Sequence, residues 1–245
     1  MLSEKVLLRL KNAYNVTALT GAGISTDSGV PTFRGKDGLW NNHKVEDIAT
    51  IDAFEKNKKL FWEFYSWRRK LLSDIKPNLG HYALVDIENY FEDFSLITQN
   101  VDNLHTLAGS KNPIELHGNI TRNRCTGCDD LTIVDKNETI EEVPKCKKCG
   151  APLKPDVVLF GEQLNQKVLQ KAQEVSAICE VFISIGTSSL VEPAASLPYI
   201  AKGNGAYLLE INTERTPLSD NCDEVIIAPS TKLLTGLVMI LDRLR

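Results

Sequence analysis

At 245 residues, the chain can bury one substantial hydrophobic core with, at most, a smaller module attached to it. Hydrophobic residues make up 42% and charged residues 24%, typical of a soluble globular protein, and a formal net charge of −4 gives no electrostatic argument for binding nucleic acid. No apolar run approaches the roughly 18 residues that span a bilayer, and the N-terminus lacks the basic-then-apolar layout of a signal peptide. We therefore expect a cytoplasmic protein without a membrane partner.

The first predicted strand, Val16–Thr20, is a short apolar and β-branched run that leads directly into a glycine-containing turn. Gly21 and Gly23 allow a tight turn and a close approach of the main chain to a pyrophosphate, and N–H groups of the next helix complete an anion site. Such glycine pairs are more often simple turns. The polar and aromatic continuation from Ser25 to Arg34 favours a nucleotide site, because an ordinary Rossmann turn passes into a plain helix.

A helical, aromatic-rich interruption follows at residues 41–75. Within it, Tyr65 and Arg68 stand three positions apart and so share one helical face. The simpler interpretation of this pair is a packed tyrosine next to a solvated arginine.

Later apolar runs predict a sheet. Strands are expected at Phe94–Thr98, Val181–Ile185, Tyr207–Ile211 and Glu224–Ile227, with helices at Asn165–Cys179 and Thr231–Leu244. Strands that alternate with helices indicate an α/β fold with a Rossmann-like, doubly wound parallel sheet. Four strands run into polar or glycine-rich sequence at their carboxyl ends, where ligands of such sheets bind, so we expect a nucleotide cleft there.

A dehydrogenase would need an acidic residue about 20 positions past the glycine turn to hold the ribose hydroxyls. Glu46 and Asp47 lie near that distance but in a helical stretch, and Asn212 or Glu214 is the better ribose ligand. This departure argues against hydride transfer.

His117 follows an apolar run and precedes a charged, cysteine-containing segment. A single histidine at a strand end is more often structural than catalytic. Its place at the junction of two predicted domains, where clefts form, favours a catalytic role instead. His105 stays unassigned, and neither His43 nor His81 has a sequence context that suggests a role.

Four cysteines form two C-x-x-C pairs, Cys125 with Cys128 and Cys146 with Cys149. This spacing is typical of a zinc ribbon, and four thiolates leave no open position, so the metal is expected to be structural. Disulfides fit a cytoplasmic chain poorly, and redox C-x-x-C motifs normally occur once. Residues 119–155 therefore predict a zinc-ribbon insertion. This insertion and residues 41–75 are expected to form a small domain together. The Rossmann-like domain is expected to comprise residues 1–40, 76–118 and 156–245.

Seven motifs follow one another along the chain. They are Gly21-Ala22-Gly23-Ile24-Ser25, Pro31-Thr32-Phe33-Arg34-Gly35, Thr98-Gln99-Asn100-Val101-Asp102-Asn103, Leu116-His117-Gly118, the two C-x-x-C pairs, Phe160-Gly161-Glu162 and Gly186-Thr187-Ser188. Together they resemble the sirtuin family of NAD-dependent protein deacylases over nearly the whole chain.

The resemblance implies that NAD and an acylated lysine of a protein or peptide meet in the domain cleft. It makes His117 the general base on a ribose hydroxyl, with Asn100 and Asp102 as further catalytic residues. The implied cofactor contacts are Gly21, Ala22, Gly23, Ser25, Asp27, Thr32, Phe33, Arg34, Trp40, Gln99, Asn100, Val101, Asp102, Gly186, Thr187, Ser188, Asn212, Thr213, Glu214 and Ser230. Two segments, Phe160-Gly161-Glu162 and Ser189–Val191, resemble two strands that clamp the substrate backbone.

The Tyr65–Arg68 pair resembles the branch of the family that accepts succinyl, malonyl or glutaryl lysine. A guanidinium binds a terminal carboxylate in a bidentate manner, and the phenol adds a donor. Ala49 and Ala53 would leave room for the longer acyl chain. Acetyl lysine stays a possible substrate.

Two other functions would use some of the same features of the sequence. Mono-ADP-ribosyl transfer to protein would use the same cofactor and cleft but would add mass to the target. A zinc-ribbon module that binds nucleic acid fits poorly with the acidic charge balance and a ribbon that is not arginine-rich.

Overall fold

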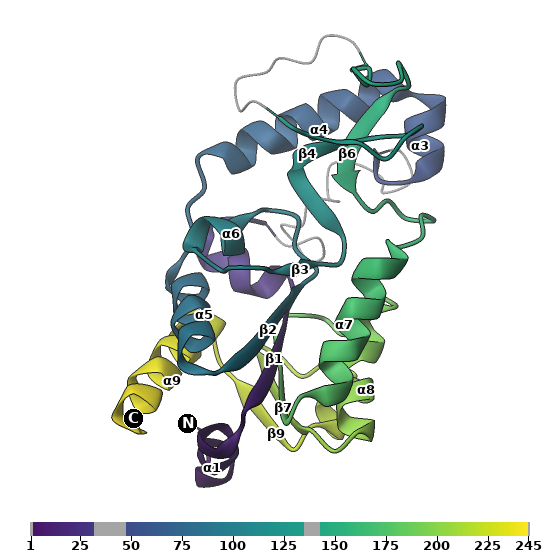
Figure 1. Cartoon of the computed structure of the whole chain (residues 1–245). Coiled ribbons are helices and arrows are strands. Elements are labelled where there is room, and N and C mark those ends of the chain that lie inside the picture. Colours follow the sequence, from purple (N-terminus) through teal and green to yellow (C-terminus); the bar gives the residue numbers. More distant parts are fainter. Residues whose placement is uncertain (1, 32–47, 135–142, 245) are drawn as a thin grey trace.

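The computed structural model describes residues 2–31, 48–134 and 143–244 and divides into two parts (Figure 1). The larger part holds a six-stranded sheet between helices, and the smaller part holds a three-stranded sheet next to two helices. Four of the expected cofactor contacts lie outside the described residues: Thr32, Phe33, Arg34 and Trp40.

The large sheet has the order β3-β2-β1-β7-β8-β9, and all its neighbouring strands are parallel. Its strands are β1 (Asn15–Thr20), β2 (Asp93–Thr98), β3 (Ile114–Glu115), β7 (Val181–Ile185), β8 (Tyr207–Asn212) and β9 (Glu224–Ile227). The five predicted strands are confirmed to within one residue at each end. The chain builds outward from β1 in one direction and from β7 in the other, which makes the β1–β7 boundary a switch point for ligand binding.

Helices cover both faces of this sheet (Figure 1). One face packs against α1 (Glu4–Asn12), α5 (Leu79–Tyr90) and α9 (Ser230–Leu244), and the other against α7 (Gln166–Ile178) and α8 (Leu197–Gly203). Strand alternation separates the two cores, since Ala18 of β1 lies in the first and Leu19 in the second. The predicted doubly wound α/β fold is therefore confirmed.

The smaller part combines segments that are far apart in the sequence. Strands β4 (Gly118–Cys125), β5 (Leu131–Ile133) and β6 (Leu153–Val157) form an antiparallel sheet, and α3 (Ile51–Lys56) and α4 (Lys58–Ser73) pack on it. Phe61 and Trp62 of α4 share one buried cluster with Cys125 and Cys146. The helical and cysteine-containing segments thus depend on the same core, whereas their exact domain boundaries stay predictions.

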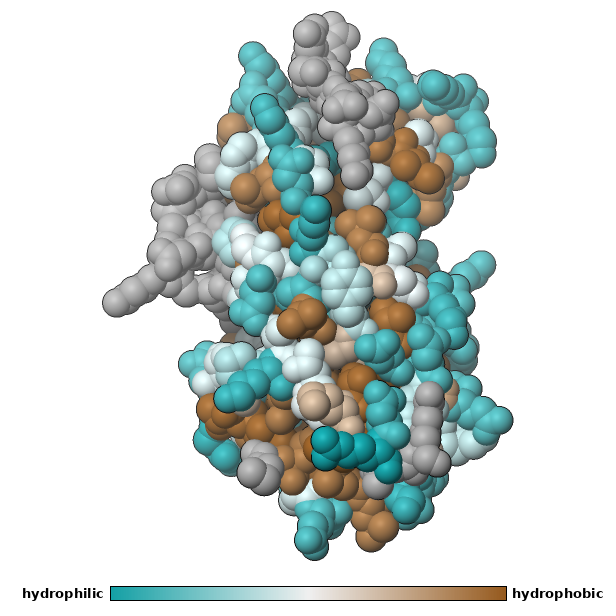
Figure 2. All heavy atoms as spheres, turned by 90° about the vertical axis from the view of Figure 1, so that its left-hand side faces the viewer, coloured by the Kyte–Doolittle hydropathy of each residue, from teal (hydrophilic) through white to brown (hydrophobic). Residues whose placement is uncertain are grey.

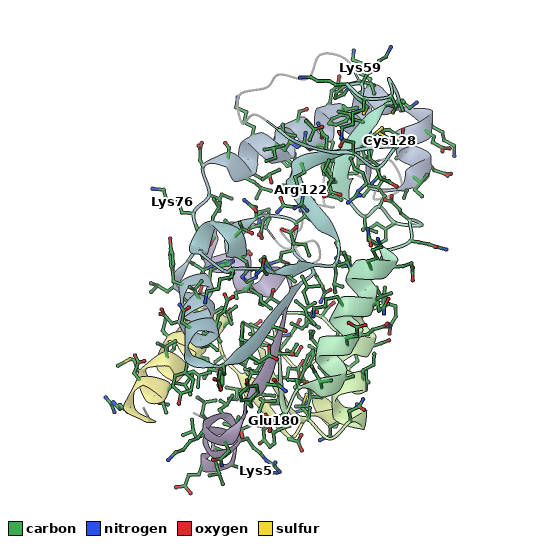
Figure 3. The ribbon with its side chains drawn as sticks, in the orientation of Figure 1. Lys5, Lys59, Lys76, Arg122, Cys128 and Glu180 are labelled. Carbon is green, nitrogen blue, oxygen red and sulfur yellow. The ribbon has the colours of Figure 1, made fainter. Side chains whose placement is uncertain are left out.

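An ion-pair network joins the two parts at Arg122 (Figure 3). Its guanidinium contacts Glu115 of β3 at 2.6 Å and Asp156 of β6 at 2.9 Å, and Arg124 contacts the other oxygen of Asp156 at 2.8 Å. Because β3 belongs to the large sheet and β6 to the small one, this network connects the two sheets beside His117.

Some large apolar side chains are exposed on the surface. On the face drawn in Figure 2, hydrophobic side chains stand among hydrophilic ones, mainly over the lower half. Leu79 and Tyr82 of α5 and Met239 of α9 are examples of large exposed apolar residues. Scattered residues of this kind are normal on folded proteins. Among the described helices, none has both the length and the apolar character needed to cross a membrane.

Candidate active site

A cleft of ≈ 650 Å³ lies at the carboxyl ends of the central strands, next to the small sheet. The predicted residues that line it are Gly21, Ala22, Gly23, Ala49, Tyr65, Arg68, Gln99, Asn100, Val101, His117, Phe160, Gly161, Glu162, Gly186, Thr187, Ser188, Val191, Asn212, Thr213, Glu214 and Ser230. Ser25, Asp27, Ala53 and Asp102 do not line it directly. One cleft therefore gathers residues from Gly21 to Ser230, most of the length of the sequence.

The floor of the cleft depends on glycines at the switch point. The Gly23 N–H donates to the Gly186 carbonyl over 2.8 Å, which joins the turn after β1 to the turn after β7. A Cβ on Gly23 would lie 2.7 Å from the Cα of Gly186, and one on Gly21 would lie 2.8 Å from the Gly186 carbonyl oxygen. Gly186 itself has a φ of +57°. Side chains at these positions would push the two loops apart, so the glycines are required by the fold as well as suited to a pyrophosphate.

A buried polar cluster lies behind this floor. The Ser25 hydroxyl at the 3₁₀ helix η1 (Ala22–Ser28) donates to Asp102 over 2.7 Å and accepts from the Asn100 amide over 3.1 Å. The same amide group donates to the Gly21 carbonyl over 3.1 Å. Burial raises the pKa of Asp102, while hydrogen bonds from the Leu104 N–H and from Ser25 act in the opposite direction. Ser25 and Asp102 thus act on the cleft through Asn100 and the glycine turn.

His117 has one ring nitrogen committed and one available for chemistry. Its Nδ1–H donates to the Gln99 carbonyl over 3.0 Å, because a carbonyl oxygen can only accept. The proton of the neutral ring therefore sits on Nδ1, and Nε2 carries the lone pair. Burial lowers the pKa of His117, so the ring is neutral near pH 7. This is the state that a general base requires.

Two buried histidines were not foreseen as site residues. His81 accepts from the Asn78 N–H at Nδ1, so its Nε2–H points to the Ser25 hydroxyl at 3.4 Å. The His105 ring lies 4.9 Å from the His81 ring, and its Nε2 is 2.9 Å from the Thr20 hydroxyl. His81 lies 56 positions from Ser25, and no local motif in the sequence signals that contact.

The His105 contact belongs to a chain of hydroxyl groups that reaches Asn100. The Thr20 hydroxyl lies 2.9 Å from the Thr98 hydroxyl, which accepts from the Asn100 N–H over 3.0 Å. Burial lowers the pKa of His81 to about 4 and that of His105 to about 3, so both rings are neutral at pH 7. Neutral rings hold this cluster without placing an uncompensated cation in the core.

The small-domain wall of the cleft carries the predicted acyl-selectivity residues. Tyr65 and Arg68 of α4 are buried, and both line the cleft. Burial raises the pKa of Tyr65 to about 12, so the phenol keeps its proton. Burial lowers the pKa of Arg68, an effect that nearby Tyr65 and Asp102 oppose. Arg68 is therefore not the solvated arginine of the simpler interpretation. Ala49 lies on the wall, whereas Ala53 packs in the core of the small part.

The two segments expected to clamp substrate are not regular strands in this structure. Phe160 makes an isolated bridge with Thr50, and its N–H donates to the Ala49 carbonyl over 2.8 Å. Residues 189–191 lie outside every strand, and Ser189 has a φ of +54°. Neither segment forms a regular strand in the described chain, and pairing of these segments with a substrate backbone stays a prediction.

Four cysteines form a candidate metal centre in the small part. Their Sγ atoms all lie within 4.8 Å of one another, with Cys125 and Cys149 3.4 Å apart and Cys128 and Cys146 3.7 Å apart. Tetrahedral zinc with Zn–S distances of about 2.3 Å would separate its sulfurs by about 3.8 Å, which this cluster fits. These distances are far too long for disulfides, and all six cysteines are free.

Main-chain groups shape the cysteine cluster as zinc knuckles. The Gly127 N–H donates to the Cys125 sulfur over 3.3 Å, and the Lys148 N–H donates to the Cys146 sulfur over 3.4 Å. Such donors stabilise thiolates. None of the four cysteines lines the cleft, and Cys128 lies in the small part (Figure 3), which suits a structural role.

Comparison with known proteins identifies the family. The Sir2 family model matches residues 21–193. A protein of Aquifex aeolicus named NAD-dependent protein deacylase is 50% identical over 231 residues, which cover 94% of this chain and 95% of the relative. A protein of Pyrococcus abyssi with the same name is 48% identical, with coverage of 86% and 88%. The chain belongs to the Sir2 family, which confirms the resemblance to sirtuins.

Solved structures agree with this assignment. A mutant Sir2 homologue in complex with ADP-ribose has a TM-score of 0.95 and 41% identity, and covers 99% of this chain and 97% of that one. A complex of Sir2 with a p53 peptide and NAD+ has a TM-score of 0.82 and 31% identity, with 98% coverage of both chains. The whole described architecture is therefore that of Sir2 proteins.

Metal analysis tests the cysteine cluster. We expect about one zinc per chain by elemental analysis. Cys146→Ser should lose the metal and lower the thermal unfolding temperature, because Cys146 belongs to the core that also holds α4. Cys222→Ser, which changes a cysteine outside the cluster, should keep the metal. A metal-free wild-type protein would contradict the zinc assignment.

The two buried histidines predict a pH dependence of stability. Below pH 6.5 the unfolded chain protonates both rings, whereas the folded chain resists protonation of His81 down to about pH 4 and of His105 down to about pH 3. Stability is therefore complete above pH 6.5 and falls as the pH falls, by about 1.4 kcal/mol per pH unit for each histidine.

His81→Asn should make this slope shallower by about 1.4 kcal/mol per pH unit between pH 6 and pH 4.5. Urea denaturation at a series of pH values measures the slope. Equal slopes for the variant and the wild-type protein would show that His81 titrates normally in the folded state.

Proposed function

We propose that this protein removes acyl groups from lysine side chains of proteins in a reaction that consumes NAD. The products are nicotinamide, the free lysine and O-acyl-ADP-ribose. The observation that carries the proposal is His117, which lines the cleft with a neutral ring whose Nδ1 is held by the Gln99 carbonyl. The family assignment and the printed names of the relatives support the same conclusion.

NAD, as co-substrate, supplies the ribose carbon that the acyl oxygen attacks as nicotinamide leaves. The glycine turn, with Gly186 packed on it, offers main-chain groups to the diphosphate, and Asn212 and Glu214 lie at the β8 side of the cleft for the adenosine ribose. His117 takes a proton from a ribose hydroxyl through Nε2, because its other nitrogen already donates to Gln99.

Asn100 is oriented for the nicotinamide end. Its amide nitrogen donates to the Gly21 carbonyl and to the Ser25 hydroxyl, so its Oδ1 is the atom that can accept from a carboxamide. Asp102 holds Ser25 in turn. The buried cluster therefore fixes which atom of Asn100 faces the ligand.

Arg68 and Tyr65 give the cleft a preference for acyl groups that end in a carboxylate. Both side chains line the cleft from α4, and a buried guanidinium binds a carboxylate more strongly than an exposed one does. Ala49 leaves space on the same wall. Succinyl and malonyl lysine are thus proposed substrates in addition to acetyl lysine.

The location and partners of the protein follow the same proposal. Six free cysteines suit a reducing compartment, so we propose a cytoplasmic location. The partners are acylated proteins, whose peptide backbone would complete strands at Phe160 and at residues 189–191. Direct nucleic-acid binding is not part of the proposal.

Mass spectrometry of acylated peptides incubated with the protein and NAD tests the function. We expect free lysine together with O-acyl-ADP-ribose, and His117→Tyr should abolish both while thermal unfolding stays cooperative, since the proposed base at the ribose is lost. Mass added to the peptide or to the protein would indicate ADP-ribosyl transfer instead. Full turnover by His117→Tyr would remove His117 from the role of base.

Arg68→Met should reduce kcat/KM for succinyl-lysine peptide far more than for acetyl-lysine peptide. The expected difference is about 1.5–3 kcal/mol, the contribution of a hydrogen bond to a charged group. Lys70→Met, which removes an exposed charge from the same helix, is the matched control and should change neither value. Equal losses on both peptides would show that Arg68 does not recognise the acyl carboxylate.

A further inference from the structure

A carboxylate lies fully buried in the middle of β8, at Glu210. Its side chain belongs to the sheet face covered by α7 and α8, since neighbouring Leu208 lies in the hydrophobic cluster of that face. Leu218 packs in the same cluster. Burial of a carboxylate in apolar surroundings destabilises the folded state unless hydrogen bonds compensate the charge.

Both carboxylate oxygens of Glu210 accept hydrogen bonds from the segment that follows β8. The Thr216 hydroxyl donates to Oε1 and the Ser219 hydroxyl donates to Oε2. Each hydroxyl also accepts from the main chain, since the Leu218 N–H donates to Thr216 over 3.1 Å and the Thr216 N–H donates to Ser219 over 2.9 Å. Glu210 therefore stabilises the turn of the segment 213–219 and holds this segment against the sheet.

The same segment forms one end of the cleft. Thr213, Glu214, Arg215, Thr216 and Pro217 line the cleft, whereas Ser219 and Glu210 do not. In the sheet order, β8 stands three strands from β2, which at about 4.8 Å per strand places this end about 14 Å from the strand that carries Asn100. Glu210 thus acts on the part of the cleft that is remote from the reacting atoms.

We infer that Glu210 is a positioning residue that holds segment 213–217 in place for the adenosine half of NAD. The inference rests on the proposed function, because it takes NAD as the ligand of the cleft. A carboxylate suits the role better than an amide, since it offers an acceptor oxygen to each of the two hydroxyls. Glutamine has one acceptor oxygen, so one hydroxyl would lose its partner and the segment would loosen.

The inference predicts a selective loss of cofactor affinity. Glu210→Gln and Ser219→Ala should each weaken binding of ADP-ribose about tenfold in calorimetric titration and raise KM for NAD by a similar factor. The value of kcat at saturating NAD and the KM for peptide should stay as in the wild-type protein. Ser219→Ala is the more telling variant, because Ser219 lies outside the cleft and any effect must pass through Glu210 and Thr216.

Glu224→Gln provides the matched control. Glu224 is also a sheet carboxylate and accepts from the Ser3 main chain and hydroxyl, yet it lies away from the cleft lining. The Glu224→Gln variant should bind ADP-ribose with the affinity of the wild-type protein. Thermal unfolding of all variants shows whether each is folded, and if Glu210→Gln does not fold, Ser219→Ala decides alone.

Three outcomes distinguish a failure of the positioning role of Glu210 from a failure of the proposed function. Unchanged ADP-ribose affinity in folded Ser219→Ala and Glu210→Gln would overturn the positioning role. A parallel fall of kcat, or of peptide affinity, would also overturn it, because it would indicate general disruption of the site. If the wild-type protein binds no ADP-ribose and consumes no NAD, the proposed function fails, and the role of Glu210 toward NAD fails with it.

Discussion

The close backbone contact between Gly23 and Gly186 is the constraint on which the rest of the site depends. It fastens the turn after β1 to the turn after β7 at the point where the two halves of the sheet diverge. Because the two backbones meet without intervening side chains, the cleft floor consists of main-chain groups and can approach a pyrophosphate closely. Ser25, in the middle of the 3₁₀ helix that follows, is thereby brought to Asn100 and Asp102.

Burial, rather than neighbouring charge, sets the protonation states around this floor. Desolvation is the largest influence on the pKa of His81, His105, His117 and Asp102. For the histidines it favours the neutral ring, which the proposed role of His117 as a base requires and which His81 needs to donate to Ser25 while accepting from Asn78. The same low polarity strengthens the hydrogen bonds that orient Asn100. One physical effect therefore favours both the neutral ring of His117 and the hydrogen bonds that orient Asn100.

The sequence predicted the sheet and most of the cleft because the relevant signals are local. Runs such as Val181–Ile185 are mainly apolar and rich in β-branched residues, and residues directly after such strands must meet at one edge. The contacts it did not predict join polar residues both far apart and near in the sequence: His81 with Ser25, Arg122 with Glu115 and Asp156, and Glu210 with Thr216 and Ser219. In each case only the fold decides which polar groups are buried together, so no spacing along the chain could reveal the pairing.

The cysteine cluster affects the cleft through packing and not through chemistry. It closes the end of the small sheet, and its buried members Cys125 and Cys146 share a core with the α4 residues that flank Tyr65 and Arg68. Arg69 extends this link, since its guanidinium donates to the Ile120 and Arg122 carbonyls of β4. Arg122 then connects β4 to the large sheet at Glu115, close to His117. The position of α4 relative to His117 therefore depends on the ribbon, so a metal with no open coordination site stabilises the wall of the cleft without taking part in its chemistry.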